Sequence, residues 1–247
     1  METYFYEAFE QMERLGPGSD ESTKRAMEFF PNPDAQLRIL DIGCGVGAHS
    51  FQLATYFPNA IITAIDNHAP NIDRLNQTAK QRGVSNRIYA ICMSMFEMTF
   101  ADASFDLIWA EGSIYIAGFE KGIQDWKRLL KIGGYIICSE ISWLLDTPSD
   151  ESYHFWHKAY PEMDTITNNL RKIEAAGYAI KGNFVSPSTD WTTHYYDLME
   201  NNLQCMREKY VDHVEAMQVV EMLQTEMDVY HSNMQDYSYV FYAMERV

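Results

Sequence analysis

The feature that most constrains this chain is an apolar segment that runs directly into a glycine-rich turn. Residues 37–42 read LRILDI, glycine follows at positions 43, 45 and 47, and a helical pattern begins near Ala48. Glycine adopts left-handed backbone conformations, and it lets a ligand approach the main chain without meeting a Cβ atom. The order strand, glycine turn, helix therefore predicts a ligand-binding turn at the carboxyl end of a strand.

The middle of the chain alternates strand-like and helix-like segments, which is typical of a mainly parallel sheet covered by helices. A chain of 247 residues is long enough for one large domain. The expected strands are 37–42, 60–66, 87–91, 105–110, 134–141, 178–186 and 237–244. We expect a single domain over 1–247, with an N-terminal helical cap at 1–36, a core at 37–141 and a lid-like segment at 142–164. The remaining residues, 165–247, are expected to form a helix and strands, with a helical insertion at 191–235.

The charge of the chain argues against a nucleic-acid partner. It carries 19 basic and 35 acidic residues, for a net charge of −16. Residues 197–237 alone hold nine acids and two bases. A nucleic-acid binder needs a cationic surface to displace counterions from phosphates. We therefore expect a small-molecule substrate.

Two further features of the sequence limit where the protein can be located and which ligands it can hold. No segment is long and uncharged enough to span a bilayer, and the opening METYFYEAF lacks the pattern of a signal peptide. We therefore expect a cytoplasmic location and no membrane partner. The four cysteines are scattered without paired spacing, so no metal site is expected. The oligomeric state is left open, with a homodimer as one option.

Asp41, two residues before the first glycine, bears on the identity of the ligand. The spacing Gly43-x-Gly45-x-x-Ala48 also fits the fingerprint of dinucleotide-binding proteins. A carboxylate at Asp41 would repel a pyrophosphate, whereas it would attract a ligand that carries ammonium and sulfonium charge. Asp66 ends the next expected strand, where a carboxylate can accept hydrogen bonds from ribose hydroxyls.

Together these segments resemble the motifs of class I S-adenosylmethionine-dependent methyltransferases. LDIGCGVG resembles the first motif of that family, AIDNHAPNIDRLN the second, SFDLIWAEG the fourth strand, and RLLKIGGYIICSE the segment that ends in the fifth strand. The resemblance covers roughly 37–140 and extends to small-molecule methyltransferases of the ubiquinone and menaquinone biosynthesis type. It implies an α/β, Rossmann-like fold with a mainly parallel seven-stranded sheet whose last strand, here 237–244, is reversed, and it implies S-adenosylmethionine as cofactor.

The resemblance also assigns residues to the cofactor. The residues that it implies are Asp41, Gly43, Gly45, Gly47, Asp66, Asn67, Ser94, Met95, Glu111 and Gly112. Ser94 departs from the family, which usually has an adenine-contacting aspartate at this position. A serine hydroxyl can still bond the adenine amino group, but without the assistance of a charge. Met95 can cover the adenine ring.

Methyl transfer demands few catalytic side chains, because the sulfonium is already activated and alignment in a closed site supplies much of the rate. By its place after the fourth strand, Glu111 is expected near the transferred methyl group or the cofactor amino group. The alternative is that Glu111 caps the helix that starts near Phe119. His194 follows a strand end and is a candidate base, which only an acceptor that must lose a proton would need.

Two questions stay open at this level. The aromatic residues of 142–164 and 191–196 form either an acceptor pocket or the core of an extra helical layer. The favoured function is methyl transfer to a small molecule. The alternatives are a nicotinamide-dependent oxidoreductase, which leaves Asp41 unexplained, and a catalytically silent binder of adenosylmethionine.

Overall fold

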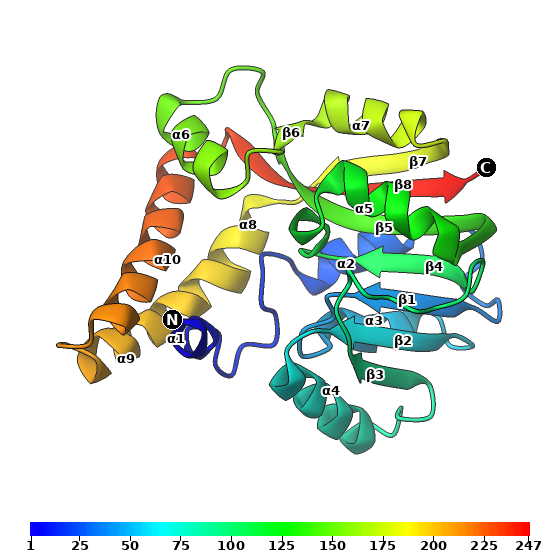
Figure 1. The fold of residues 1–247 in the computed structure, drawn as a ribbon, viewed down its shortest axis with the longest axis horizontal. Helices are drawn as coiled ribbons and strands as arrows, with labels where there is room; N and C mark the ends of the chain where they lie inside the picture. Colours follow the sequence, from blue (N-terminus) through cyan, green and yellow to red (C-terminus); the bar gives the residue numbers. More distant parts are fainter.

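The computed structural model describes the backbone of residues 1–247 and every side chain except that of Glu2. One sheet runs through the molecule in the order β3-β2-β1-β4-β5-β8-β7 (Figure 1). The strands are β1 Arg38–Ile42, β2 Ile61–Asp66, β3 Ile88–Cys92, β4 Phe105–Ala110, β5 Leu130–Trp143, β6 Asp164–Thr165, β7 Tyr178–Val185 and β8 Tyr237–Arg246. The helices are α1 Glu2–Glu7, α2 Asp20–Met27, α3 Ala48–Tyr56, α4 Ala69–Gln81, α5 Phe119–Trp126, α6 Asp150–Ala159, α7 Ile166–Ala175, α8 Ser188–Trp191, α9 Asp197–Lys209 and α10 Val214–Asn233.

The predicted fold class is confirmed. Strands β1 to β5 pair in parallel. The reversed strand is β8, which lies antiparallel between β5 and β7. The two-residue strand β6, which pairs with β5, was not predicted, because two residues are too few to show a strand period.

Side chains alternate between the two faces of the sheet, as the pleat requires. Along β4, Leu107 and Trp109 pack in the hydrophobic cluster between the sheet and helices α2 and α3. Ile108 and Ala110 pack in the hydrophobic cluster on the other face, between the sheet and helices α5 and α7. Because β1, β2 and β4 run parallel, their carboxyl ends meet at one edge of the sheet (Figure 1). The fold therefore brings the glycine turn and the residues after β2 and β4 to the same place.

A helical layer built from α8, α9 and α10 lies beyond that edge, with α1 packed beside it (Figure 1). The expected helical insertion at 191–235 is broken, since α9 ends at Lys209 and α10 begins at Val214. A π-helical turn at Thr192–Tyr196 joins α8 to α9. The expected lid-like segment contains α6. No helix in the described part of the chain is long and apolar enough to cross a membrane.

The surroundings of Trp191 show whether this aromatic residue lines a pocket or belongs to the core. Its side chain is 1% exposed and stacks on Tyr230 and Tyr239, with ring centroids 4.7 and 5.2 Å away. Its indole N–H donates a hydrogen bond to Ser238 Oγ at 3.1 Å. Trp191 is therefore core, and for this residue the pocket interpretation is wrong.

We predict that Trp191→Ala lowers the free energy of unfolding by about 3–5 kcal/mol, because it removes a large buried side chain and leaves a cavity. Val211→Ala is the control, since Val211 is 71% exposed in the turn between α9 and α10. Denaturant unfolding of both variants measures the difference. A Trp191→Ala variant within about 1 kcal/mol of the parent would contradict the assignment to the core.

Candidate functional site

The glycine turn is shaped by backbone hydrogen bonds and by close packing. The N–H of Gly43 donates to Ile65 O at 2.8 Å, and Gly47 has a φ of 96°, in the left-handed region that favours glycine. A Cβ atom at Gly43 would lie 2.4 Å from Ser113 Cβ, and one at Gly47 would lie 2.6 Å from Leu75 Cγ. Both positions therefore require glycine for space as well as for conformation.

Asp66 links the carboxyl end of β2 to this turn. Its Oδ2 accepts a hydrogen bond from Gly45 N at 3.0 Å, and its Oδ1 accepts one from His68 N at 2.8 Å. Asp66 is partly exposed, and Asn67 beside it is exposed. Each carboxylate oxygen has a second lone pair, so Asp66 can still accept hydrogen bonds from a ribose.

Asp41 is fully buried beneath the turn. Its Oδ2 accepts a hydrogen bond from Ser50 Oγ at 2.5 Å, whereas its Oδ1 has no partner among the described residues. Burial raises the pKa of Asp41 to about 6, although His49 and Ser50 act in the opposite direction. A carboxylate in this state is an acceptor that gains from a nearby positive charge.

Glu111 follows β4 and is the most heavily bonded acid at this edge. Thr23 Oγ1 lies 2.9 Å from both of its carboxylate oxygens, Arg14 Nη1 donates to Oε1 at 2.9 Å, and His49 Nε2 lies 3.3 Å from Oε1. Burial opposes ionisation, but the charges of His49 and Arg14 outweigh it and lower the pKa of Glu111. The alternative in which Glu111 caps the next helix is wrong, because the N-cap of α5 is Gly118.

Sequence reasoning missed three of these partners: Arg14, Thr23 and His49. His49 could have been found, since it stands in the first turn of α3, two residues after Gly47. Arg14 and Thr23 carried no local signal. They contact Glu111 across 97 and 88 residues of chain, and only the tertiary fold brings them together.

The segment 13–17, here called the strap, crosses directly over the glycine turn. Leu15 Cδ1 lies 3.2 Å from the position that a Cβ atom at Gly45 would take. The cavity between the strap and the turn measures about 60 Å³ and is lined by both, together with His49, Glu111 and Gly112. Pockets that hold a drug-sized ligand measure about 300–1,000 Å³. This cavity is therefore too small for a nucleotide-sized ligand while the strap holds its present position.

The N-terminal helical cap also contacts the residues that follow β2. Tyr6 of α1 stacks on His68, with ring centroids 3.5 Å apart.

Ser94 and Met95, which follow β3, are both partly buried, and Ser94 Oγ accepts a hydrogen bond from Phe96 N at 3.2 Å. Their proposed contacts with adenine stay predictions.

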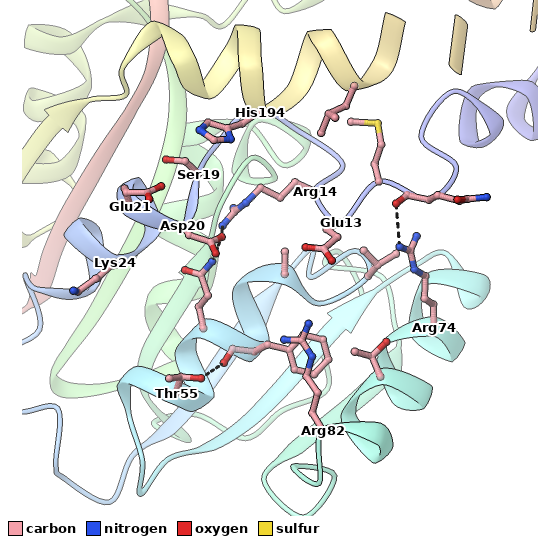
Figure 2. Close-up of a pocket in the computed structure, with 18 of the residues that line it drawn as sticks. Glu13, Arg14, Ser19, Asp20, Glu21, Lys24, Thr55, Arg74, Arg82 and His194 are labelled. Carbon is pink, nitrogen blue, oxygen red and sulfur yellow. Dashed lines mark hydrogen bonds and ion pairs between the residues drawn. The ribbon is translucent and has the colours of Figure 1, made fainter. Parts of the chain in front are cut away.

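His194 lies in a cleft next to the cavity over the glycine turn. It is exposed in the π-helical turn, and the cleft, which measures about 1240 Å³, is also lined by Ser19 and Glu21 (Figure 2). The cleft and the cavity beside Glu111 share Arg14 and three other lining residues, but His194 lines only the cleft and Glu111 lines only the cavity. His194 and Glu111 therefore lie in two adjoining cavities. No group of three metal-ligating side chains occurs among the described residues.

Comparison with known proteins places the chain among methyltransferases. Residues 33–202 match the family model described as a methyltransferase domain. Sterol 24-C-methyltransferase erg-4 of Neurospora crassa is 33% identical over 177 residues, which cover 67% of this chain and 42% of that protein. The chain therefore spans less than half the length of this curated relative.

Two solved structures share the fold over nearly their whole length. One is a SAM-dependent methyltransferase from Geobacter sulfurreducens in complex with S-adenosyl-L-homocysteine, with a TM-score of 0.84, 19% identity, and coverage of 99% of this chain and 98% of that one. The other is YjhP from E. coli, with a TM-score of 0.84, 19% identity and coverage of 99% of both chains.

We predict that Arg14→Met loosens the strap, because the segment loses its ionic anchor on Glu111. Amide hydrogen exchange at residues 13–18 should rise by about tenfold or more, since a hydrogen bond to a charged group contributes about 1.5–3 kcal/mol. Lys24→Met is the control, because Lys24 is exposed and forms no ion pair with a described residue. Exchange that is unchanged in Arg14→Met would show that the strap is held by other contacts.

Proposed function

The chain belongs to the methyltransferase-domain family, and we propose that it transfers a methyl group from S-adenosylmethionine to a small-molecule acceptor. The observation that carries this proposal is the set of three carboxylates around the glycine turn. Asp41, Asp66 and Glu111 stand at the carboxyl ends of β1, β2 and β4, where parallel α/β sheets bind their ligands.

The chemistry of these groups fits the methyl donor. S-adenosylmethionine carries ammonium and sulfonium charges, which buried carboxylates attract, and ribose hydroxyls, which Asp66 can bond. A Cβ atom at Gly112 would meet no atom within 4 Å, so the main chain there borders open space. Glu111 matches the ammonium of the amino acid end, and Arg14, released from Glu111 when the strap moves, matches its carboxylate. A dinucleotide pyrophosphate would face Asp41 and Glu111 and be repelled, which disfavours the nicotinamide alternative.

The residues of this chain supply alignment and exclusion of water. Methyl transfer is an in-line displacement, so a site closed to solvent that holds the acceptor in line supplies much of the rate. We propose that the cap at 1–36 and the segment 142–164 close over the site, with the strap as the part that moves.

The identity of the acceptor stays at the level of a small molecule. The relatives named above include a sterol C-methyltransferase, which favours an apolar acceptor of low charge. The closeness to ubiquinone and menaquinone methyltransferases, the cytoplasmic location and the homodimer stay predictions.

We predict that Asp66→Ala weakens the binding of S-adenosylhomocysteine by about 1.5–3 kcal/mol, or roughly 10- to 150-fold in Kd, because hydrogen bonds to a charged acceptor are lost. Asp73→Ala removes the same charge from an exposed position on α4 and should bind like the parent. Titration calorimetry on folded variants measures both. NADH should not bind the parent protein. Equal affinity of the two variants, or tight binding of NADH, would contradict the proposal.

A further inference from the structure

The strap separates two cavities that adjoin each other. The cavity of about 60 Å³ over the glycine turn and the cleft of about 1240 Å³ share four lining residues. Two of them, Glu13 and Arg14, belong to the strap, and the other two, Val46 and Ala48, belong to the turn and to the start of α3. A strap that moves away from the glycine turn therefore has the cleft to move into, and the two cavities then become one.

The wall of the cleft that α3 and α4 form carries cations and no acid. Its charged members are Arg74 and Arg82 (Figure 2). Positions 74, 78 and 82 all line the cleft and follow one another at intervals of four, so both guanidinium groups and Thr78 between them lie on one face of the helix. The guanidinium carbon of Arg82 lies 4.4 Å from the centroid of the Phe51 ring, which also lines the cleft.

The two arginines lack acidic partners in a chain that carries 35 acids and 19 bases. Among the described residues, neither Arg74 nor Arg82 forms an ion pair, and the same is true of Glu13, which is exposed. The acids that line the cleft all belong to the N-terminal cap: Glu10, Glu13, Asp20 and Glu21. An unpaired carboxylate on the strap and two unpaired guanidinium groups on α4 thus border one cleft (Figure 2).

The strap is within reach of these cations because the chain just before it is attached to α4. Arg74 Nη2 donates a hydrogen bond to Gln11 O at 3.5 Å, and Glu13 follows Gln11 by two residues, or about 7 Å of extended chain. Gln11 has a φ of 62°, in the left-handed region that non-glycine residues seldom adopt, so the chain bends there. At the other end of the strap, a Cβ atom at Gly16 would meet nothing within 4 Å. Gln11 and Gly16 are therefore suited to act as its two hinges.

We propose that the strap has a second, open position, in which Glu13 pairs with Arg74 and Arg82 at the wall of the cleft. This inference deepens the proposed function, and it rests on that function where it concerns the methyl donor. In the closed position that the structure shows, the strap is held by the ion pair between Arg14 and Glu111, whose atoms are 2.9 Å apart. Opening breaks that pair, and the pair formed by Glu13 offsets part of the loss.

The open position then determines how well the methyl donor binds. The cavity over the glycine turn admits a nucleotide-sized ligand only when the strap is open, and the apparent affinity falls in proportion to the fraction of molecules that are open. A change of charge at Glu13 or on α4 therefore alters the affinity for the donor while Asp41, Asp66 and Glu111 stay as they are. The effect should be a few-fold, because an exposed ion pair contributes little free energy.

A double-mutant cycle on the full chain tests the proposed pair. Arg74→Glu and Glu13→Lys each place like charges at the contact, whereas the double variant restores opposite charges. Amide hydrogen exchange at residues 13–18 of the ligand-free protein reports opening directly. We expect exchange to slow about fivefold in each single variant and to recover in the double variant. The Kd for S-adenosylhomocysteine should rise by the same factor in the single variants and recover likewise.

Glu21→Lys is the matched control, because Glu21 is an exposed acid that lines the same cleft but lies on α2, outside the strap. It should leave exchange at residues 13–18 within about twofold of the parent, and it should not rescue Arg74→Glu. Arg82→Glu repeats the cycle with the second guanidinium group, which forms no hydrogen bond with Gln11.

The outcomes separate the inference from the proposed function. Unchanged or faster exchange in Arg74→Glu would overturn the inference, since Arg74 would then only hold the cap in its closed position through Gln11. Slow exchange that persists in the double variant would overturn it as well. Recovery of exchange in the double variant, without any binding of S-adenosylhomocysteine to the parent, would instead contradict the proposed function and leave the two-state strap standing.

Discussion

Buried carboxylates at the carboxyl edge of the sheet are the constraint on which the rest of this structure depends. The side chain of Glu111 is only 2% exposed, and an isolated charge at such a position would be costly. The compensating guanidinium comes from Arg14, whose side chain is itself 9% exposed. The N-terminal segment is therefore part of the electrostatics of the site, and its position determines whether the edge is open or closed.

The residues on either side of the strap connect it to the helical layer. Gly18 N donates to Asp190 O at 3.1 Å, and Ser22 Oγ donates to Asp190 Oδ2 at 2.6 Å. Farther out, Asn202 of α9 donates to Ala8 O at 2.9 Å. The N-terminal cap, of which the strap is a part, thus contacts the glycine turn, α8 and α9. A displacement of the strap that admits the methyl donor would therefore also alter the contacts between the cap and the helical layer.

The sequence predicted what local patterns determine and failed where distant segments meet. The strands, the glycine turn and the reversed β8 follow from periodicity, from glycine spacing and from resemblance, and the structure has them. The role proposed for His194 relied on its place after β7, but α8 and the π-helical turn carry it to the outer cleft. The partners of Glu111 arise from packing between segments far apart in sequence, which no window of residues can display.

The central claim is that the acid-lined glycine turn holds the methyl donor once the strap moves. A crystal structure of the protein with S-adenosylhomocysteine tests it most directly. The account predicts ligand density against Gly45 and Gly112, a ribose bonded to Asp66, and residues 13–17 displaced from the positions that they occupy here. Density in the larger cleft lined by Arg74 and His194, or a ligand at the turn with the strap unmoved, would contradict it.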